Sequence, residues 1–390
     1  MNELTRTGLF IAGAAALIAA AGWVRPDAAS SAIYSDTGEQ FFPSFRNVDA
    51  VKAIEVVDYD EAEAVARPLK VEFRKNRWLL TSHGDYPAEA RDRLGRTAAA
   101  LLDIKKDIPA TDRVEDHVKF GVLDPLDAKN PSLQGRGKRI TLRDAGGATL
   151  AELVLGLAVK DKPGYRYVRL PGQKRVYAVK TEADPSAQFA DWVEPNLLRV
   201  SPAGIVKMTL NSYQIDEQMG RIANLQRTTY ERGQPSWTPQ AQAIANALAS
   251  LRVTGAKPKP KELADQLRAG ELALTIDTVM SLRQRGFFIA PNGLLLSNEG
   301  ELIAETAQGL QYAVRFGELA TDSGAASAKP RENRYAFITI SSRKPETTEA
   351  AQALTAKFAD WYYIISGADF ARLHPARAAE IRERLNPRRP

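Results

Sequence analysis

The alternation of apolar and polar residues predicts two series of elements in the same order along the chain. Segments 51–57 and 205–210 are rich in β-branched residues, and each predicts the strand that opens a series. The first series continues with strands at 69–73 and 78–80, joined by a hairpin turn at Lys75-Asn76-Arg77. The second continues with a strand around 227–230.

A helix comes next in each series, because apolar residues then recur at i, i+4 and i+7. The first helix is expected from about Pro87, and the second has Thr238 as its cap and Pro239 at its first position. The recurring residues, which we expect to face a core, are Leu94, Ala98 and Leu101 in the first helix and Ile244, Leu248 and Leu251 in the second.

The later parts of the two series also correspond. A glycine ends each of the matching strands, Gly156 in the first series and Gly317 in the second. The polar loop 320–333 has no counterpart and is interpreted as an insertion. The remaining predicted strands are 140–142, 165–167 and 176–179 in the first series, and 294–296 and 335–340 in the second.

The tetrapeptide Phe-Ala-Asp-Trp occurs twice, at 189–192 and 358–361, and predicts the helix that closes each series. Asp184 would cap the first helix, with Pro185 at its first position and Pro195 at its end. The second would run from about Thr348, with Leu354, Phe358, Trp361 and Ile365 as one apolar stripe. Because the Phe and Trp stand three residues apart, we expect them to be core residues rather than ligand-stacking residues.

These patterns predict an α+β protein built from two tandem repeats, each a mainly antiparallel sheet with packed helices, preceded by one N-terminal transmembrane helix. A length of 390 residues favours two domains. The expected boundaries are 1–28 for a membrane anchor and tether, 29–199 and 200–366 for the repeats, and 367–390 for a C-terminal helix and basic tail.

The uncharged segment from Thr7 to Val24 predicts a single-pass membrane anchor. As a helix it would reach about 27 Å, close to the thickness of a bilayer's hydrocarbon core, and Trp23 with Arg25 would lie at the interface. A cleaved signal peptide is the alternative, because Ala19-Ala20-Ala21 offers a small-residue cleavage site. A buried alanine-rich helix of a soluble protein is a third interpretation. The expected location is the inner membrane, with the bulk of the chain in the periplasm.

Composition narrows the possible chemistry. The apolar fraction of 44% and the charged fraction of 26% are typical of a globular protein. The absence of cysteine excludes thiol catalysis, thiolate metal sites and disulfides, but leaves the compartment open. The net charge is +6. The densest cluster of positively charged residues lies at the C-terminus and is interpreted as a solvated tail rather than a contact with lipid, glycan or nucleic acid. That run comprises Arg382, Arg384, Arg388 and Arg389.

The chain offers no motif with a catalytic or metal-binding spacing. His83, His117 and His374 lack a partner at ligand spacing and are expected to be surface or hydrogen-bonded histidines. Segment 135–138 lacks the upstream glycine and the following Ser or Thr of a phosphate loop.

Two groups of acidic residues and one basic segment also lack the spacing of a metal-binding or nucleic-acid-binding motif. The acids Asp58, Asp60, Glu61 and Glu63 lack the glycine turn and distal glutamate of a calcium loop. Asp191 and Asp360, inside the repeated tetrapeptide, are expected to pair with an arginine or to face water. Segment 257–261 lacks interleaved aromatic residues and is interpreted as a linker, so no nucleic-acid partner is expected. We therefore expect no catalytic, cofactor-binding or metal-binding residue, and no cofactor.

The chain resembles the domain-of-unknown-function 4340 family. The resemblance rests on a hairpin bearing Trp78, the phrase Phe-Gly-Val-Leu-Asp-Pro at 120–125, a strand ending Leu-Val-Leu-Gly at 153–156, and Tyr167-Val168. It covers about 50–200 well and the second half more loosely, at 312–317 and in the closing Phe-Ala-Asp-Trp-Tyr segment. The resemblance implies a protein tethered to the bacterial inner membrane and facing the periplasm, in some cases associated with gliding-type ABC transporters. It implies no activity.

The sequence leaves three functions open. The favoured hypothesis is a non-catalytic, membrane-tethered scaffold or accessory protein of a membrane complex, such as an ABC transporter. The second is a periplasmic module that binds a glycan or peptide in the cleft between the repeats. The third is an enzyme that uses dispersed carboxylates, which requires acids with perturbed pKa values in one pocket.

Overall fold

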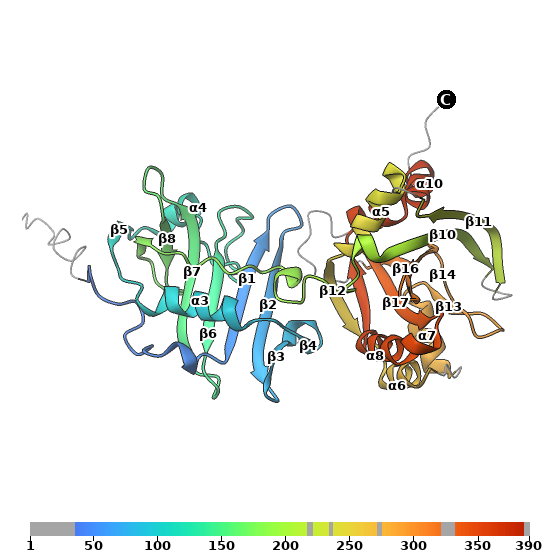
Figure 1. Ribbon diagram of the computed structural model, residues 1–390. Helices are drawn as coiled ribbons and strands as arrows, with labels where there is room; N and C mark the ends of the chain where they lie inside the picture. The colour runs from blue at the N-terminus through green and yellow to red at the C-terminus, as the bar shows by residue number, and fades with distance from the viewer. Residues whose placement is uncertain (1–35, 217–220, 234–236, 271–274, 321–331, 386–390) are drawn as a thin grey trace, which may run out of the picture.

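The protein consists of two large antiparallel sheets with packed helices (Figure 1), which confirms the predicted α+β class. The computed structural model describes residues 36–216, 221–233, 237–270, 275–320 and 332–385. The predicted anchor, 7–24, and most of the predicted insertion, 320–333, lie outside these residues. Within the described residues, no helix is both long and apolar enough to cross a bilayer.

The first sheet has nine strands in the order β4-β3-β2-β1-β6-β7-β8-β9-β5. One α-helix, α3 (Arg91–Leu102), packs its buried Leu94, Ala98 and Leu101 against it, and the short α4 (His117–Phe120) lies near β8. The strands are β1 (Ala53–Asp60), β2 (Val65–Arg74), β3 (Arg77–Leu80), β4 (Tyr86–Pro87), β5 (Ile108–Thr111), β6 (Lys138–Arg143), β7 (Thr149–Ala158), β8 (Tyr165–Arg169) and β9 (Val176–Lys180).

The second sheet has seven strands in the order β11-β10-β15-β16-β17-β18-β12. These are β10 (Ile205–Asp216), β11 (Arg221–Glu231), β12 (Val253–Pro258), β15 (Glu301–Thr306), β16 (Leu310–Leu319), β17 (Arg334–Ser342) and β18 (Trp361–Ile365). A separate two-stranded sheet pairs β13 (Phe287–Ile289) with β14 (Leu295–Ser297).

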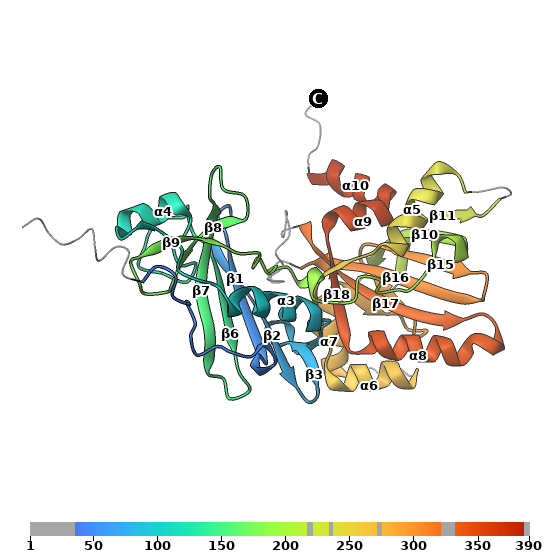
Figure 2. The same cartoon turned by 60° about the vertical axis from the view of Figure 1, so that its left-hand side comes forward.

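Helices cover both faces of the second sheet. Figure 2 shows α5, α9 and α10 on one side and α6 and α8 on the other. The helices are α5 (Pro239–Ala249), α6 (Lys261–Ala269), α7 (Ile276–Arg283), α8 (Thr348–Ala359), α9 (Gly367–Leu373) and α10 (Pro375–Leu385).

The two sheets share one topology. The order β2-β1-β6-β7-β8-β9-β5 in the first corresponds strand for strand to β11-β10-β15-β16-β17-β18-β12 in the second. The matching glycines have a common role, because a side chain at Gly156 would collide with the Phe120 carbonyl oxygen and one at Gly317 with that of Arg285. Each glycine therefore allows a crossing segment to approach the sheet closely.

The repeated tetrapeptide does not mark equivalent positions. The prediction of a first closing helix after Asp184 was wrong, whereas the second predicted helix is α8, which begins at Thr348 as predicted but ends at Ala359 and is followed by β18. The first copy forms a 3-10 turn, η4 (Phe189–Asp191), that comes after the last sequential strand of its sheet. The second copy contains the end of α8 and the first residue of β18, so it precedes the last strand. The aromatic and β-branched run 361–365 favours a strand, which places Trp361 and Ile365 outside the predicted helical stripe.

The expectation that the tetrapeptide aromatics are core residues is confirmed for three of the four. Phe189, Trp192 and Phe358 are buried, whereas Trp361 is partly buried. In the first copy the Trp192 indole donates a hydrogen bond to the Ser186 carbonyl (2.8 Å), and the Ser186 hydroxyl bonds Asp191. Such local side-chain bonds compete with helix formation.

The predictions of α3 and α5 were correct to within a few residues, whereas that of the C-terminal region was not. Thr238 caps α5 by accepting a hydrogen bond from the Ala241 amide. Helix α3 begins at Arg91 rather than Pro87, because Tyr86–Pro87 pairs with β3. The C-terminal region contains two helices rather than one, and Arg382 lies in α10 rather than in a tail.

Candidate functional site: an exposed strand edge

Strand β11 forms one edge of the second sheet, on the side far from the first sheet (Figure 1). It has 11 residues, whereas a typical strand has about five or six. Every side chain of β11 is exposed except that of Tyr230. Among the described residues β10 is its only neighbouring strand, so its outer edge presents unpaired backbone N–H and C=O groups.

A row of polar side chains connects this edge to the interior of the sheet. Arg227 in β11 donates to the Asn211 side-chain oxygen in β10 (3.1 Å), and the Asn211 amide donates to Glu301 in β15 (2.8 Å). Glu301 also pairs with Arg315 in β16 (3.1 Å). Because Asn211 and Glu301 are buried, these bonds stabilise the position of the hairpin more than exposed contacts would.

The hairpin is also fixed at a bulge. The register between β10 and β11 shifts between Ser212 and Gln214. Tyr213, at the bulge, is buried beside Ala290, and its hydroxyl accepts a hydrogen bond from the Ser297 amide (3.2 Å). Burial raises the pKa of Tyr213, so this side chain remains neutral and acts as an anchor.

A polar cavity of about 440 Å³ lies between the hairpin and α10. Asn224 and Gln226 of β11 line it together with Arg377 of α10. The Arg377 guanidinium is occupied by Glu299 (3.0 Å) and Glu380 (2.8 Å). Amide side chains with donors and acceptors suit contact with a peptide backbone.

The sequence predicted only the part of β11 around 227–230. The outer part was missed because polar residues and Asn224, which has a left-handed backbone (φ 54°), interrupt the apolar alternation. The apolar residues Ile222 and Leu225 were the sequence signal that could have extended the predicted strand, and the structure shows that both are exposed.

The three histidines are at separate sites, as expected, and two of them have backbone carbonyl partners. His117 bonds the Lys174 carbonyl (2.8 Å) and His374 that of Asn211 (3.3 Å). His83 contacts the Ser82 hydroxyl (2.9 Å), and burial lowers its pKa to about 4. No group of three or more metal-ligating residues occurs within the part of the chain that the structure describes.

The acidic cluster is a structured turn. Asp60 pairs with Arg67 (2.9 Å) and accepts the Ala62 and Glu63 amides, which lowers its pKa. Glu61 accepts the Gly135 amide (3.3 Å). Segment 135–138, which lacks the residues of a phosphate loop, is therefore held to this turn by the hydrogen bond from Gly135 to Glu61.

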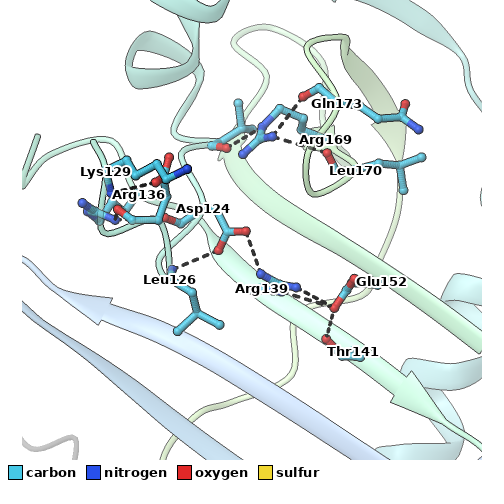
Figure 3. Close-up of polar contacts among 12 residues, drawn as sticks. Asp124, Leu126, Lys129, Arg136, Arg139, Thr141, Glu152, Arg169, Leu170 and Gln173 are labelled. Carbon is cyan, nitrogen blue, oxygen red and sulfur yellow. Dashed lines mark hydrogen bonds and ion pairs between the residues drawn. The ribbon is translucent and has the colours of Figure 1, made fainter. Parts of the chain in front are cut away.

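Figure 3 shows why the arginines near the 120–125 phrase have structural roles. Arg136 donates to the carbonyl oxygens of Asp124 (2.9 Å) and Asn130 (2.7 Å), and Arg139 bridges Asp124 (2.7 Å) and Glu152 (2.9 Å). Buried Arg169 donates to the Val122 carbonyl (2.9 Å). These guanidinium groups hold a loop against the first sheet.

The predicted linker 257–261 instead contains the end of β12 and the start of α6, and its Pro258 lies against Gly84 of the first sheet. Its Lys259 is buried, and the ammonium group donates to the carbonyls of Phe358 (2.9 Å) and Trp361 (2.5 Å).

Asp360 pairs with Arg268 and Asp191 with Arg252 (3.3 Å), so both tetrapeptide acids have arginine partners. A polar cavity of about 220 Å³, lined by Asp191 and Arg252, lies here. It is smaller than the cavity beside β11.

The family model described as "Domain of unknown function (DUF4340)" matches residues 78–273, half of the chain. The chain belongs to the DUF4340 family. The match begins at Trp78 in β3 and includes β10 to β12, so family membership covers parts of both sheets. No curated protein and no solved structure matches the chain.

Proposed function

We propose that this DUF4340 protein is a non-catalytic scaffold or accessory protein of a membrane complex, and that it docks a partner at the outer edge of β11. The length and exposure of this edge strand carry the proposal. An extended partner segment would add a strand to the sheet, with affinity from main-chain hydrogen bonds. Arg221 and Arg227 in β11, with Arg232 directly after it, outnumber Glu231, so the matching segment is acidic.

The proposed location is the inner membrane, with the anchor at 7–24 and both sheets in the periplasm. The support is the uncharged N-terminal segment. The partner is then a membrane protein with an extended periplasmic segment, such as a subunit of an ABC transporter. Cell fractionation followed by N-terminal sequencing tests the anchor, and an intact Met1 in the soluble cytoplasm would contradict it.

Site-specific photocrosslinking in cells tests the docking edge. A benzophenone amino acid at Leu225 is expected to capture a membrane protein that is then identified by mass spectrometry. The matched control is the same probe at Val65, an equally exposed apolar residue on β2 of the first sheet.

Charge substitution gives a second measurement of the same edge. Leu225→Glu should reduce co-purification of the captured partner from detergent extracts, whereas Val65→Glu should not. Equal capture from both positions, or a monomer without neighbours in detergent, would refute the proposed edge.

A further inference from the structure

A cavity of about 420 Å³ opens on the first sheet beside the β2–β3 hairpin. Phe73 and Trp78 line it from the hairpin, Leu94 and Gly95 from α3, and Val51 from the segment before β1. Its volume is within the range of small-molecule sites. The cavity shares no residue with β11, so a ligand bound here would be independent of the proposed docking edge.

Two aromatic rings form an accessible apolar wall of this cavity. Phe73 and Trp78 are directly opposite each other in the hairpin, with ring centroids 5.2 Å apart at an interplanar angle of 61°. Phe73 is 37% exposed, because it stands beside the cavity rather than in the core. Aromatic side chains with accessible rings supply apolar contact area to a ligand.

Three cations line the cavity together with this apolar wall. Lys52, Arg77 and Arg91 line the cavity, and none of them pairs with a carboxylate of a described residue. Lys52 instead places its ammonium group 5.6 Å from the centroid of the Phe73 ring. Asp49 is the one acid among the described residues of the lining, so the three cations give the cavity a net positive charge.

Gly95 lines the cavity from α3. It lies inside α3, where glycine is less favourable than alanine. Packing does not require glycine here, because a Cβ atom at this position would meet no atom within 4 Å. Gly95 therefore lowers helix stability without relieving a collision, and its effect is to leave space in the cavity that it lines.

We propose that this cavity binds a small organic anion in which a carboxylate is attached to an apolar ring or chain. The ring or chain contacts Phe73 and Trp78, and the carboxylate faces Lys52, Arg77 and Arg91. Both parts of the ligand are needed, because an apolar molecule leaves the cations unpaired and a simple anion leaves the aromatic wall in water.

Calorimetric titration of the full-length chain in lipid nanodiscs tests this proposal, with empty nanodiscs as the blank. The probes are 2-naphthoate and decanoate, which present a ring and a chain, and neutral 2-naphthol. At least one carboxylate should bind, and 2-naphthol should bind at least tenfold more weakly than 2-naphthoate if the ring is preferred. If the chain is preferred, decanol replaces naphthol as the neutral probe.

Substitutions at Gly95 separate binding from folding. Gly95→Leu should abolish carboxylate binding while raising the urea midpoint, because leucine is a better helix former than glycine. Gly95→Ala should also raise the midpoint but change affinity less than threefold. Arg91→Gln should weaken binding at least fivefold, whereas Lys180→Gln, at an exposed position on β9, should not. Binding that survives Gly95→Leu, or neutral and anionic probes with equal affinity, would overturn the proposal, as would no binding by either carboxylate.

Discussion

The ring of Tyr86, in the edge strand β4 of the first sheet, packs edge-on against the ring of Trp361, in β18 of the second, with centroids 4.8 Å apart. Close to this pair, the β12 residue Pro258 approaches Gly84, where a side chain would meet the proline ring. Lys357 of α8 also pairs with Glu194 (2.7 Å). One continuous hydrophobic cluster therefore extends from the first sheet into the second.

We expect Tyr86 and Trp361 to be energetically coupled. A double-mutant cycle with Tyr86→Ala and Trp361→Ala should give a coupling free energy of about 0.5–1.5 kcal/mol, as for other aromatic pairs. Urea denaturation monitored by circular dichroism measures it. As a control, Trp361→Ala combined with Leu157→Ala, at an exposed position on β7, should be additive. A zero coupling would show that this ring pair adds nothing to the stability of the junction beyond its other contacts.

Trp192 should contribute more to stability than Trp361, because it is completely buried. Trp192→Ala should lower the free energy of unfolding by about 3–5 kcal/mol. Trp192→Phe keeps most of the apolar volume but loses the hydrogen bond to Ser186, so a smaller loss is expected. A Trp192→Ala variant as stable as the wild type, but unable to bind a partner, would instead assign the residue to recognition.

Lys259 gives a test of a buried cation. Complete burial lowers its pKa well below the usual value, and the Asp360 carboxylate acts in the opposite direction. Its ammonium group also lies 4.2 Å from the centroid of the Phe337 ring. Lys259→Ala should cost about 2–4 kcal/mol, because it creates a cavity and removes a donor from two carbonyls.

The matched variant Lys259→Met retains most of the length of the side chain and removes the charge. It should cost less than the alanine variant, because methionine fills most of the space that alanine leaves empty, whereas both variants remove the charge and the two hydrogen bonds. Thermal and urea unfolding of both variants provide the comparison. Equal losses would mean that the two hydrogen bonds, rather than the packing, determine the effect.

His374 should make stability depend on pH. Burial, with the charge of Arg377 acting in the same direction, lowers its pKa to about 4. Since the carbonyl of Asn211 can only accept, Nε2 carries the hydrogen, and the buried Nδ1 has no partner among the described residues. Protonation would place a charge on that unpartnered atom.

The direction of this pH dependence is set by the two pKa values of His374, about 6.5 in the unfolded chain and about 4 in the folded chain. Between these values the unfolded chain binds more protons than the folded chain, so stability is complete above pH 6.5 and decreases as the pH falls. The loss attributable to His374 between pH 7 and 4 is about 3 kcal/mol. Urea unfolding at several pH values should show a weaker dependence for His374→Gln, with part of the remainder from His83 and His117, whose pKa values burial also lowers. An unchanged pH profile would contradict this assignment.

Patterns along the chain alone predicted most of the local elements and their repeated order. Apolar spacing identified α3 and α5, and the Thr238-Pro239 pair located the start of α5, because caps and periodicity act within a few residues. The absence of cysteine, and the motif Phe-Gly-Val-Leu-Asp-Pro at 120–125 that the chain shares with the DUF4340 family, could also be recognised from the chain alone. The resemblance to the DUF4340 family was confirmed over 78–273.

The contacts between those elements follow from the folded arrangement and could not be predicted from the chain. The two tetrapeptides have the same letters, yet one is a turn after β9 and the other contains the start of β18, because each adopts the conformation that its neighbours stabilise. The exposed edge of β11, the junction at Tyr86 and Trp361, and the cavity beside Gly95 each depend on residues far apart in the chain. Strand order and side-chain packing are long-range properties, so spacing along the sequence does not determine them.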